Sequence, residues 1–257
     1  MLNFLGIGAQ KAGTTWLFKR LSMHPNIYFP RGKEMHFWNK FDRSNPGSVV
    51  HYSRVFNDGH FYRQNKFKVG EITPEYATLG DVELSALREM APEVRIFYSL
   101  RDPADRMWSA LKMHLLLQQR DIRLVGTDEL LAMARMPQFY DQTNYSKNIE
   151  NWLRFFSRQQ MCIVMFDRFR SAPYQVLTTL SRHLGIDENF YQLLPPAVLG
   201  GIVFEGHRAS MPADVRSEFV TMFDDTIRGV EDFIGSKLPT WRAIPTDSAN
   251  QDAHTSA

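Results

Sequence analysis

A glycine-containing loop near the N-terminus has the residue types of a phosphate-binding site. Gly8 and Gly13 are spaced as in the phosphate loop G-x-x-x-x-G-K-[ST], and Thr15 stands at the hydroxyl position. The lysine of that template is missing, because Thr14 occupies its place and Lys11 lies inside the spacer. The loop keeps amides that can bind a phosphate at a helix N-terminus, but lacks the lysine that reaches a γ-phosphate. This pattern favours a nucleotide whose reactive group is attached to its 5′-phosphate.

A second segment, Lys33-Glu34-Met35-His36-Phe37-Trp38, carries candidate acid-base residues. It follows a short expected strand, and the ligand crevice of an open parallel sheet lies beyond the carboxyl ends of its strands. Glu34 or His36 can therefore take a proton from an attacking hydroxyl group. The alternative is that both are ordinary loop residues beside aromatic side chains of the core.

A third segment offers a second phosphate site. Arg101 closes the strongest expected strand, and Ser109 lies eight residues further on, two turns into the next helix. A guanidinium and a hydroxyl group can jointly hold one phosphate. The alternative is an ion pair between Arg101 and Asp102, with Ser109 an ordinary helix residue.

The elements that must position these residues alternate between short apolar strands and amphipathic helices. This order predicts an α/β fold with three layers, like that of P-loop proteins, in which helices flank a central, mainly parallel sheet. We expect strands over 2–7, 27–29, 68–72, 94–100 and 161–166, and helices over 14–23, 102–120, 144–158, 174–184 and 212–234. Since no repeat or linker divides the chain, we expect one domain over 1–244 and a disordered tail over 245–257.

Composition excludes several classes of protein. The 257 residues include 30 basic and 28 acidic ones, and a net charge of +2 gives no bulk attraction to nucleic acid or an anionic membrane. The only cysteine, Cys162, excludes an intramolecular disulfide, and its apolar neighbours predict a buried strand thiol. No apolar run approaches the roughly 18 residues of a membrane span. We therefore expect a cytoplasmic protein with no nucleic-acid partner and no membrane span.

Together these motifs resemble the sulfotransferases that use 3′-phosphoadenosine 5′-phosphosulfate (PAPS), and more closely the heparan sulfate sulfotransferases and their bacterial relatives. Segment 10–16 resembles the family's 5′-phosphosulfate loop, and segment 100–109 resembles its 3′-phosphate motif. Segment 33–37 resembles the stretch whose glutamate is the catalytic base in that branch. The resemblance continues through 69–76 and 151–156 to Trp241. One departure is Ile72, where the glycosaminoglycan enzymes commonly have a lysine.

The resemblance implies a role for each candidate residue. Glu34 is the expected base, His36 is the second candidate or a partner that orients Glu34, and Lys11 stabilises the leaving oxygen. The expected donor contacts are Lys11, Ala12, Gly13, Thr14, Thr15 and Trp16 at the 5′ end, Arg101 and Ser109 at the 3′-phosphate, and Arg208 in a closing loop. The indole of Trp16 packs either near the adenine or in the core. The reaction yields adenosine 3′,5′-bisphosphate (PAP) and requires no metal.

Two alternative functions are less compatible with these residues. A P-loop kinase or nucleoside triphosphatase needs a lysine at position 14 and an acidic magnesium ligand at the end of a strand, but Thr14 and Arg101 occupy those places. A non-catalytic nucleotide-binding protein would be expected to have lost Lys11 or Glu34. The expected acceptor is a hydroxyl-bearing small molecule or saccharide. Several aromatic residues either stack on it or belong to the core: Phe37, Trp38, Tyr52, Phe56, Phe61 and Tyr62.

Overall fold

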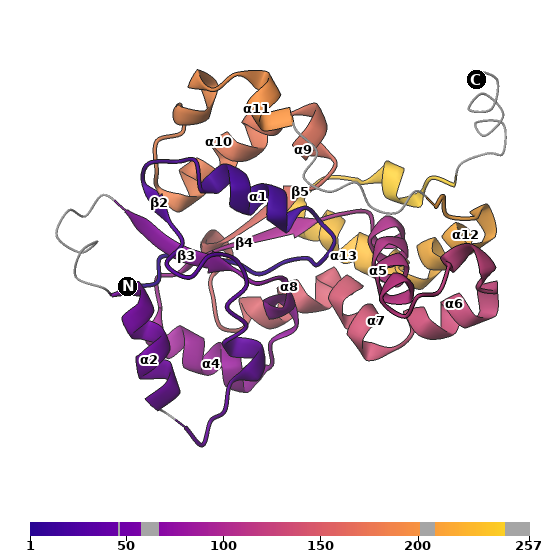
Figure 1. Ribbon diagram of the computed structural model, residues 1–257, viewed down its shortest axis with the longest axis horizontal. Coiled ribbons are helices and arrows are strands. Elements are labelled where there is room, and N and C mark those ends of the chain that lie inside the picture. Colours follow the sequence, from indigo (N-terminus) through magenta and orange to yellow (C-terminus); the bar gives the residue numbers. More distant parts are fainter. Residues whose placement is uncertain (46, 58–66, 201–208, 245–257) are drawn as a thin grey trace. The chain divides into compact units, whose positions relative to one another are not determined.

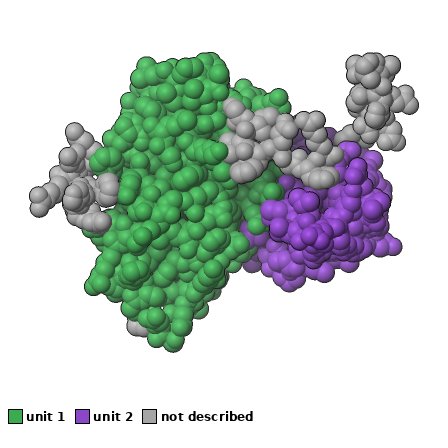
Figure 2. Space-filling view, in the orientation of Figure 1, with its two compact units in different colours: residues 1–101, 148–204 green, residues 102–147, 205–257 purple. Residues whose placement is uncertain are grey.

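A computed structural model describes residues 1–45, 47–57, 67–200 and 209–244. Contacts between Cα atoms divide the chain into two compact units (Figure 2). Unit 1 consists of Met1–Arg101 and Asn148–Phe204, and unit 2 consists of Asp102–Lys147 and Glu205–Ala257. Unit 1 contains the sheet and unit 2 is helical. A single domain over 1–244 remains a prediction.

The centre of unit 1 is a five-stranded sheet in the order β2-β3-β1-β4-β5, and each neighbouring pair of strands is parallel (Figure 1). The predicted α/β architecture with a parallel sheet is therefore confirmed. Most of the strands are almost continuously apolar, as expected of strands covered on both faces. Their bounds are β1 Phe4–Gly6, β2 Ile27–Tyr28, β3 Lys68–Ile72, β4 Arg95–Leu100 and β5 Met161–Met165.

Helices cover both faces of this sheet (Figure 1). One face carries α1 (Thr14–Leu21), α9 (Arg168–Ser171), α10 (Pro173–Leu184) and α11 (Pro196–Gly200), and the other carries α2 (Gly47–Phe56), α4 (Asp81–Met90) and most of α8 (Tyr145–Leu153). The core of the first face joins strand residues to α1 and α10: Phe4, Ile72, Phe97, Leu17, Leu21, Leu177 and Leu180. No helix within the described ranges is long and apolar enough to cross a bilayer.

Unit 2 is built from α5 (Pro103–Leu117), α6 (Thr127–Ala134), α7 (Pro137–Thr143), α12 (Ala213–Met222) and α13 (Asp224–Ile234). Asp102 caps α5 by accepting from the amides of Ala104 and Asp105, at 2.9 and 3.2 Å. The same carboxylate accepts from Arg216 on α12 at 2.7 Å. The start of α5 is thereby fixed to α12. Short 3₁₀ helices complete the described chain: η1 Trp38–Lys40, η2 Pro74–Thr78, η3 Ile122–Leu124, η4 Arg158–Gln160, η5 Phe190–Leu193 and η6 Pro239–Arg242.

Two expected helices end earlier than their hydrophobic periodicity predicts. The helix expected over 212–234 is interrupted at Phe223, whose buried side chain belongs to the core of unit 2. Two aspartates in the first turn of α13 favour a new helix N-terminus there. The helix expected over 144–158 ends at Leu153, and Ser157 then begins the capping box of η4.

Gly13, the residue before α1, has a backbone that only glycine adopts without strain and a position with no room for a side chain. Its φ is +78°, and an added Cβ would lie 2.7 Å from the rings of Phe166 and Phe169. Gly32 provides a comparison, because its φ is +74° and no atom lies within 4 Å of its added Cβ. Glycine at position 13 therefore meets two requirements, and at position 32 only one.

We expect Gly13→Ala to lower the free energy of unfolding by about 2–4 kcal/mol, because the conformational strain of a left-handed residue adds to the cost of overpacking. Gly32→Ala should lower it by only about 1 kcal/mol. Urea denaturation of both variants measures the difference. Equal losses in the free energy of unfolding would show that the rings of Phe166 and Phe169 move aside at no cost in stability.

Candidate functional site

The segments singled out in the sequence start from one edge of the sheet in unit 1. The carbonyl of Gly6, at the end of β1, accepts from the amide of Thr73 at 2.9 Å, immediately after β3. On the other side, the amide of Ala9 donates to the carbonyl of Ser99 on β4 at 2.7 Å. The glycine loop therefore leaves the sheet between the ends of β3 and β4, where the crevice of an open parallel sheet is expected.

The glycine loop is bound to the end of β4 by two side chains. The hydroxyl of Ser99 donates to the carbonyl of Ala12 at 2.5 Å, and the guanidinium of Arg101 donates to the carbonyl of Lys11 at 3.2 Å. Lys11 has a φ of +69°, so its backbone is left-handed. The guanidinium of Arg101 also lies 5.0 Å from the ring centre of Phe166. Two segments that the sequence assigned to phosphate binding are thus in direct contact.

Helix α1 begins immediately after this loop and presents its positive end there. Gly13 is the residue before the helix and supplies no side-chain cap, and the first turn contains no acidic residue. The first amides of an α-helix have no acceptor within the helix, so those at Thr14, Thr15 and Trp16 are available to an anion. The arrangement suits a phosphate group and requires no lysine at position 14.

The indole of Trp16 lies in the core of unit 1. Trp16 is 7% exposed, and its ring stacks on Phe169 with the ring centres 4.7 Å apart. The indole nitrogen donates to the carbonyl of Leu199 at 3.0 Å. Of the two placements expected for this ring, packing in the core is the one observed. The backbone amide of Trp16 remains a predicted phosphate contact.

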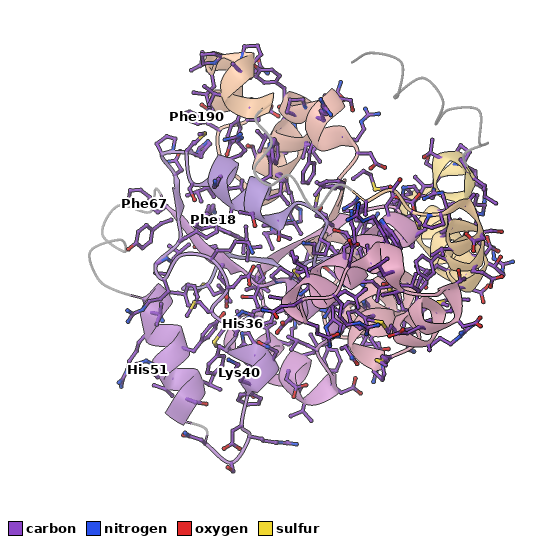
Figure 3. The ribbon with its side chains drawn as sticks, turned by 45° about the vertical axis from the view of Figure 1, so that its right-hand side comes forward. Phe18, His36, Lys40, His51, Phe67 and Phe190 are labelled. Atoms are coloured by element: carbon purple, nitrogen blue, oxygen red, sulfur yellow. The ribbon has the colours of Figure 1, made fainter. Side chains whose placement is uncertain are left out.

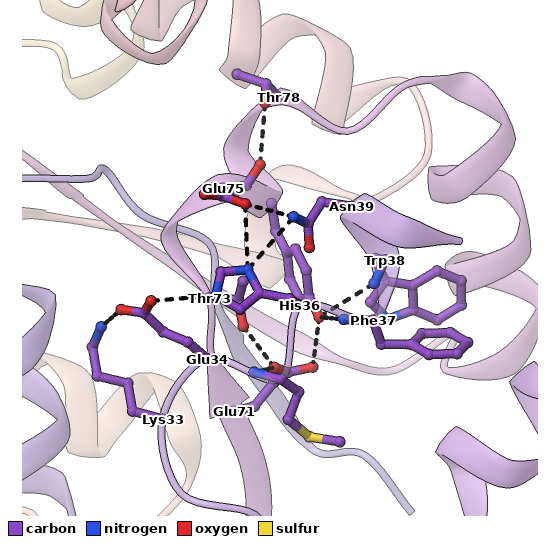
Figure 4. A network of polar contacts seen from close by, with 12 residues as sticks. Lys33, Glu34, His36, Phe37, Trp38, Asn39, Glu71, Thr73, Glu75 and Thr78 are labelled. Carbon is purple, nitrogen blue, oxygen red and sulfur yellow. Dashed lines mark hydrogen bonds and ion pairs between the residues drawn. The ribbon is translucent and has the colours of Figure 1, made fainter. Parts of the chain in front are cut away.

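The loop that carries Glu34 and His36 has an unusual backbone, since both residues are left-handed, with φ of +68° and +54°. Such conformations are rare outside glycine and persist only where the surroundings fix them. Here β3 and η2 fix them by binding successive amides of the loop (Figure 4). The amide of Glu34 donates to the carbonyl of Ile72 at 3.0 Å, and the amide of Met35 donates to the carboxylate of Glu71 at 3.2 Å. The amides of Phe37 and Trp38 both donate to the hydroxyl of Tyr76, at 2.9 and 3.3 Å.

Glu71 is the centre of this network and is fully buried. Its two carboxylate oxygens accept from four donors: the hydroxyls of Tyr52, Tyr76 and Thr73, and the amide of Met35. Burial raises the pKa of Glu71, while the four hydrogen bonds oppose that rise. The carboxylate therefore connects the end of β3, helix α2 and the loop of Glu34. Sequence reasoning missed this role, although an acidic residue inside the apolar strand 68–72 was a signal for it.

The side chains of Glu34 and His36 lie close together, with 3.4 Å between a carboxylate oxygen and Nε2. Lys33 forms an ion pair with the same glutamate. On the other side of the imidazole ring, Nδ1 lies 3.3 Å from a carboxylate oxygen of Glu75 on η2. These side chains are partly exposed, so the pair that the sequence proposed for proton transfer can be reached from solvent. Burial lowers the pKa of Lys33 to about 8, so the cation beside Glu34 loses its proton in mildly alkaline solution.

Two further residues are expected at the site, Ser109 and Arg208, whereas Cys162 is expected to be a buried strand thiol. Ser109 is half-buried in the second turn of α5, which belongs to unit 2, whereas Arg101 ends unit 1. Arg208 lies outside the described residues. Cys162 is half-buried on β5, and burial raises its pKa to about 11, so the thiol stays protonated and is a poor nucleophile at neutral pH.

Most of the aromatic residues considered for an acceptor site belong to the core. Trp38, Tyr52 and Phe56 are at most 2% exposed, and the half-buried Phe37 stacks on Tyr52 with the ring centres 4.3 Å apart. Phe61 and Tyr62 lie outside the described residues. Figure 3 places His36 and Lys40 in the segment that follows β2. These described aromatic rings pack on one another beside the Glu34 loop.

Comparison with known proteins identifies the family. The model of the sulfotransferase domain matches residues 3–194 of this chain. The chain belongs to the sulfotransferase family. It is similar to a solved sulfotransferase from Alicyclobacillus acidocaldarius, with a TM-score of 0.69 and 25% identity over 95% of this chain and 99% of that one. A mouse sulfotransferase complexed with PAP shares the fold, with a TM-score of 0.53 over 91% of this sulfotransferase and 86% of the mouse chain, at 13% identity.

The curated relatives of this sulfotransferase belong to the predicted heparan sulfate branch. It is 28% identical to the bifunctional heparan sulfate N-deacetylase/N-sulfotransferase 1 of Caenorhabditis briggsae, over 72% of this chain and 23% of that protein. It is 27% identical to the human heparan sulfate glucosamine 3-O-sulfotransferase 3B1, over 72% of this chain and 47% of that protein. The chain thus spans less than half the length of these relatives. The predicted resemblance to this branch is confirmed.

The Glu71 network makes a prediction about stability and pH. We expect Glu71→Gln to lower the free energy of unfolding by about 1–3 kcal/mol below pH 4.5. There Glu71 is a protonated carboxyl group, and both of its oxygens still have lone pairs that accept hydrogen bonds, whereas the amide nitrogen of glutamine accepts none. Because the pKa of Glu71 is raised in the folded state, folding favours the protonated carboxyl group. This contribution to stability is fully present below pH 4.5 and is lost as pH rises through the pKa of the folded state. The difference between wild type and variant should therefore shrink with rising pH.

Urea denaturation at several pH values measures this difference. Glu89→Gln is the matched control, because Glu89 is exposed on α4. A difference that grows with pH would contradict the raised pKa of Glu71.

Proposed function

We propose that this sulfotransferase moves the sulfuryl group of PAPS to a hydroxyl group of a small-molecule or saccharide acceptor, with Glu34 as the base. The observation that carries the proposal is the convergence, at one sheet edge, of the glycine loop with its bound Arg101 and of the Glu34–His36 pair. Phosphate recognition and a proton acceptor are the two functions that such a transfer needs. Family membership supports the same reaction class.

The donor is expected to bind with its 5′-phosphosulfate at the start of α1. The amides of 12–16 and the hydroxyls of Thr14 and Thr15 would hold the phosphate, since they lie at a helix N-terminus with no competing acidic residue in its first turn. Arg101 and Ser109 would hold the 3′-phosphate, and Arg208 would belong to a loop that closes over the nucleotide.

In the proposed reaction the acceptor oxygen attacks sulfur in line with the bridging oxygen, and Glu34 takes the hydroxyl proton. The new oxygen–sulfur bond forms as the bond from sulfur to the bridging oxygen breaks. The electron pair of that bond leaves with the 5′-phosphate of PAP, where Lys11 stabilises the added negative charge. The scheme uses no metal, because one nucleotide phosphate is the leaving group.

The acceptor is inferred from the relatives and from the residue at position 72. The relatives named above act on heparan sulfate, a saccharide, and this supports a saccharide or another hydroxylated molecule as acceptor. Ile72, at the position where a lysine is common in the glycosaminoglycan enzymes, is fully buried. An acceptor with less negative charge than heparan sulfate is therefore proposed. A labelled-sulfate transfer screen across alcohols, phenols and sugars identifies it.

Nucleotide binding tests the donor. Without added magnesium, PAP should raise the melting temperature, since a ligand at one hundred times its dissociation constant adds about 2.7 kcal/mol to the free energy of unfolding. ATP with magnesium should give a much smaller shift, because it carries no 3′-phosphate for Arg101. Thermal unfolding monitored by fluorescence measures both. A larger shift with ATP and magnesium would overturn the proposal in favour of a nucleoside triphosphatase or kinase.

Substitution of the proposed base tests the reaction. Glu34→Gln should reduce turnover by about 10²–10⁴-fold, while PAP binds nearly as well as to the wild type, because the base faces the acceptor. The control is Glu89→Gln, which should leave both unchanged. Sulfate transfer and PAP-dependent melting are measured on the same preparations. Near-normal turnover of Glu34→Gln, combined with an inactive His36→Ala, would assign the base to His36.

A further inference from the structure

Glu75 is a partly exposed carboxylate beside the proposed base that the reaction described above does not use. We propose that Glu75 is a positioning residue that holds His36 as a proton relay for Glu34. The proposal rests on the proposed function, in which Glu34 takes the acceptor proton. In this proposal the proton passes from Glu34 to His36, and the carboxylate of Glu75 stabilises the protonated ring.

The geometry places the imidazole ring of His36 between two carboxylates. Nε2 lies 3.4 Å from Glu34 and Nδ1 lies 3.3 Å from Glu75, so each ring nitrogen faces one acidic group (Figure 4). Both distances are longer than that of a hydrogen bond, and catalytic contacts commonly shorten when substrate binds. The left-handed backbone of His36, held by the amides on either side of it, keeps the ring in this position.

Asn39 fixes the carboxylate of Glu75. Its side-chain nitrogen donates to that carboxylate at 2.5 Å, whereas the same nitrogen is 3.5 Å from Nδ1 of His36. The 3.5 Å contact with Nδ1 is at the limit of a hydrogen bond, whereas the carboxylate of Glu75, which only accepts, lies nearer to Nδ1, at 3.3 Å. Nδ1 is therefore placed to donate its proton to Glu75. This tautomer leaves the lone pair of Nε2 directed toward Glu34. A carboxylate that selects a histidine tautomer in this way is the arrangement of the Ser-His-Asp triad.

The charged groups around the ring come from four elements. Glu34 and Lys33 belong to the same loop, and Lys33 is paired with Glu34 rather than with the ring. Glu75 faces the ring from η2. Glu71, on β3, is engaged by its four donors and holds the backbone of the loop, while Lys40 is exposed on η1. The charged groups that face the two ring nitrogens are thus both acids.

The proton balance of the relay is complete without another reactant. The acceptor hydroxyl gives its proton to Glu34 as its oxygen bonds to sulfur, and Glu34 passes that proton to Nε2 of His36. The ring becomes an imidazolium whose Nδ1 proton stays on the ring and faces the carboxylate of Glu75, which stabilises the positive charge. Glu34 is again ionised. The imidazolium then releases one proton to water near Glu75, whose side chain is 43% exposed.

Glu75→Gln tests the relay because it removes the negative charge and keeps the shape of the side chain. We expect kcat to fall by roughly 10- to 100-fold, the usual cost of losing the partner of a functional histidine, with little change in the acceptor KM or in PAP binding. Glu89→Gln should leave all three unchanged. In a His36→Ala background, Glu75→Gln should cost almost nothing further, because the residue acts through His36.

Ring-nitrogen NMR of His36 separates the relay from the proposed function, since it needs no acceptor. In the protein saturated with PAP, Nδ1 should carry the proton of the neutral ring, and Glu75→Gln should weaken that preference. An Nε2-protonated ring in the wild type, or losses from Glu75→Gln and His36→Ala that multiply, would overturn the relay. If PAP fails to bind while the free protein shows the expected tautomer, the proposed function fails and the placement of Glu75 stands.

Discussion

The structure of the candidate site depends on one buried carboxylate. Glu71 accepts hydrogen bonds from three hydroxyl groups and from the amide of Met35, between the two left-handed residues Glu34 and His36. An acidic group without partners at this depth would cost several kcal/mol, so the four donors are necessary for the fold as well as for the site. The strained backbone that aims Glu34 and His36 is stabilised by the same contacts.

A second constraint is the parallel order of the sheet. Because β3, β1 and β4 are adjacent and parallel, the chain leaves all three at the same edge, and the glycine loop is bonded to its neighbours on both sides. The segments proposed for phosphate recognition, at the start of α1, and for proton transfer, in the Glu34 loop, thereby start from the same end of the sheet although they are about twenty residues apart in the sequence. Gly13 allows this, since two phenylalanine rings occupy the space of its missing side chain.

The boundary between the two compact units falls after Arg101, inside the predicted 3′-phosphate motif. Arg101 ends unit 1 and contacts the glycine loop, while Asp102 begins unit 2 and caps α5, the helix that carries Ser109. Each half of the predicted 3′-phosphate motif is therefore fixed by its own unit. Arg101 and Asp102 are adjacent in the sequence, yet the first is bound to the glycine loop and the second caps α5.

The sequence by itself determined the fold class, the family and the segments that matter. Strand periodicity predicted the parallel sheet, which the structure confirms, and the spacing of Gly8, Gly13 and Arg101 predicts phosphate binding; both signals are local and depend on backbone geometry. It misplaced helix ends at Phe223 and Leu153, where core packing and a capping box override periodicity.

Only the tertiary structure decided how the acidic residues are divided among roles. Glu71 and Glu75 are four residues apart and look alike in the sequence, yet one is fully buried under four donors and the other faces His36 at the surface. Burial and hydrogen-bond partners set what a carboxylate does, and both come from residues distant in the chain. Spacing therefore locates a site, whereas packing assigns its parts.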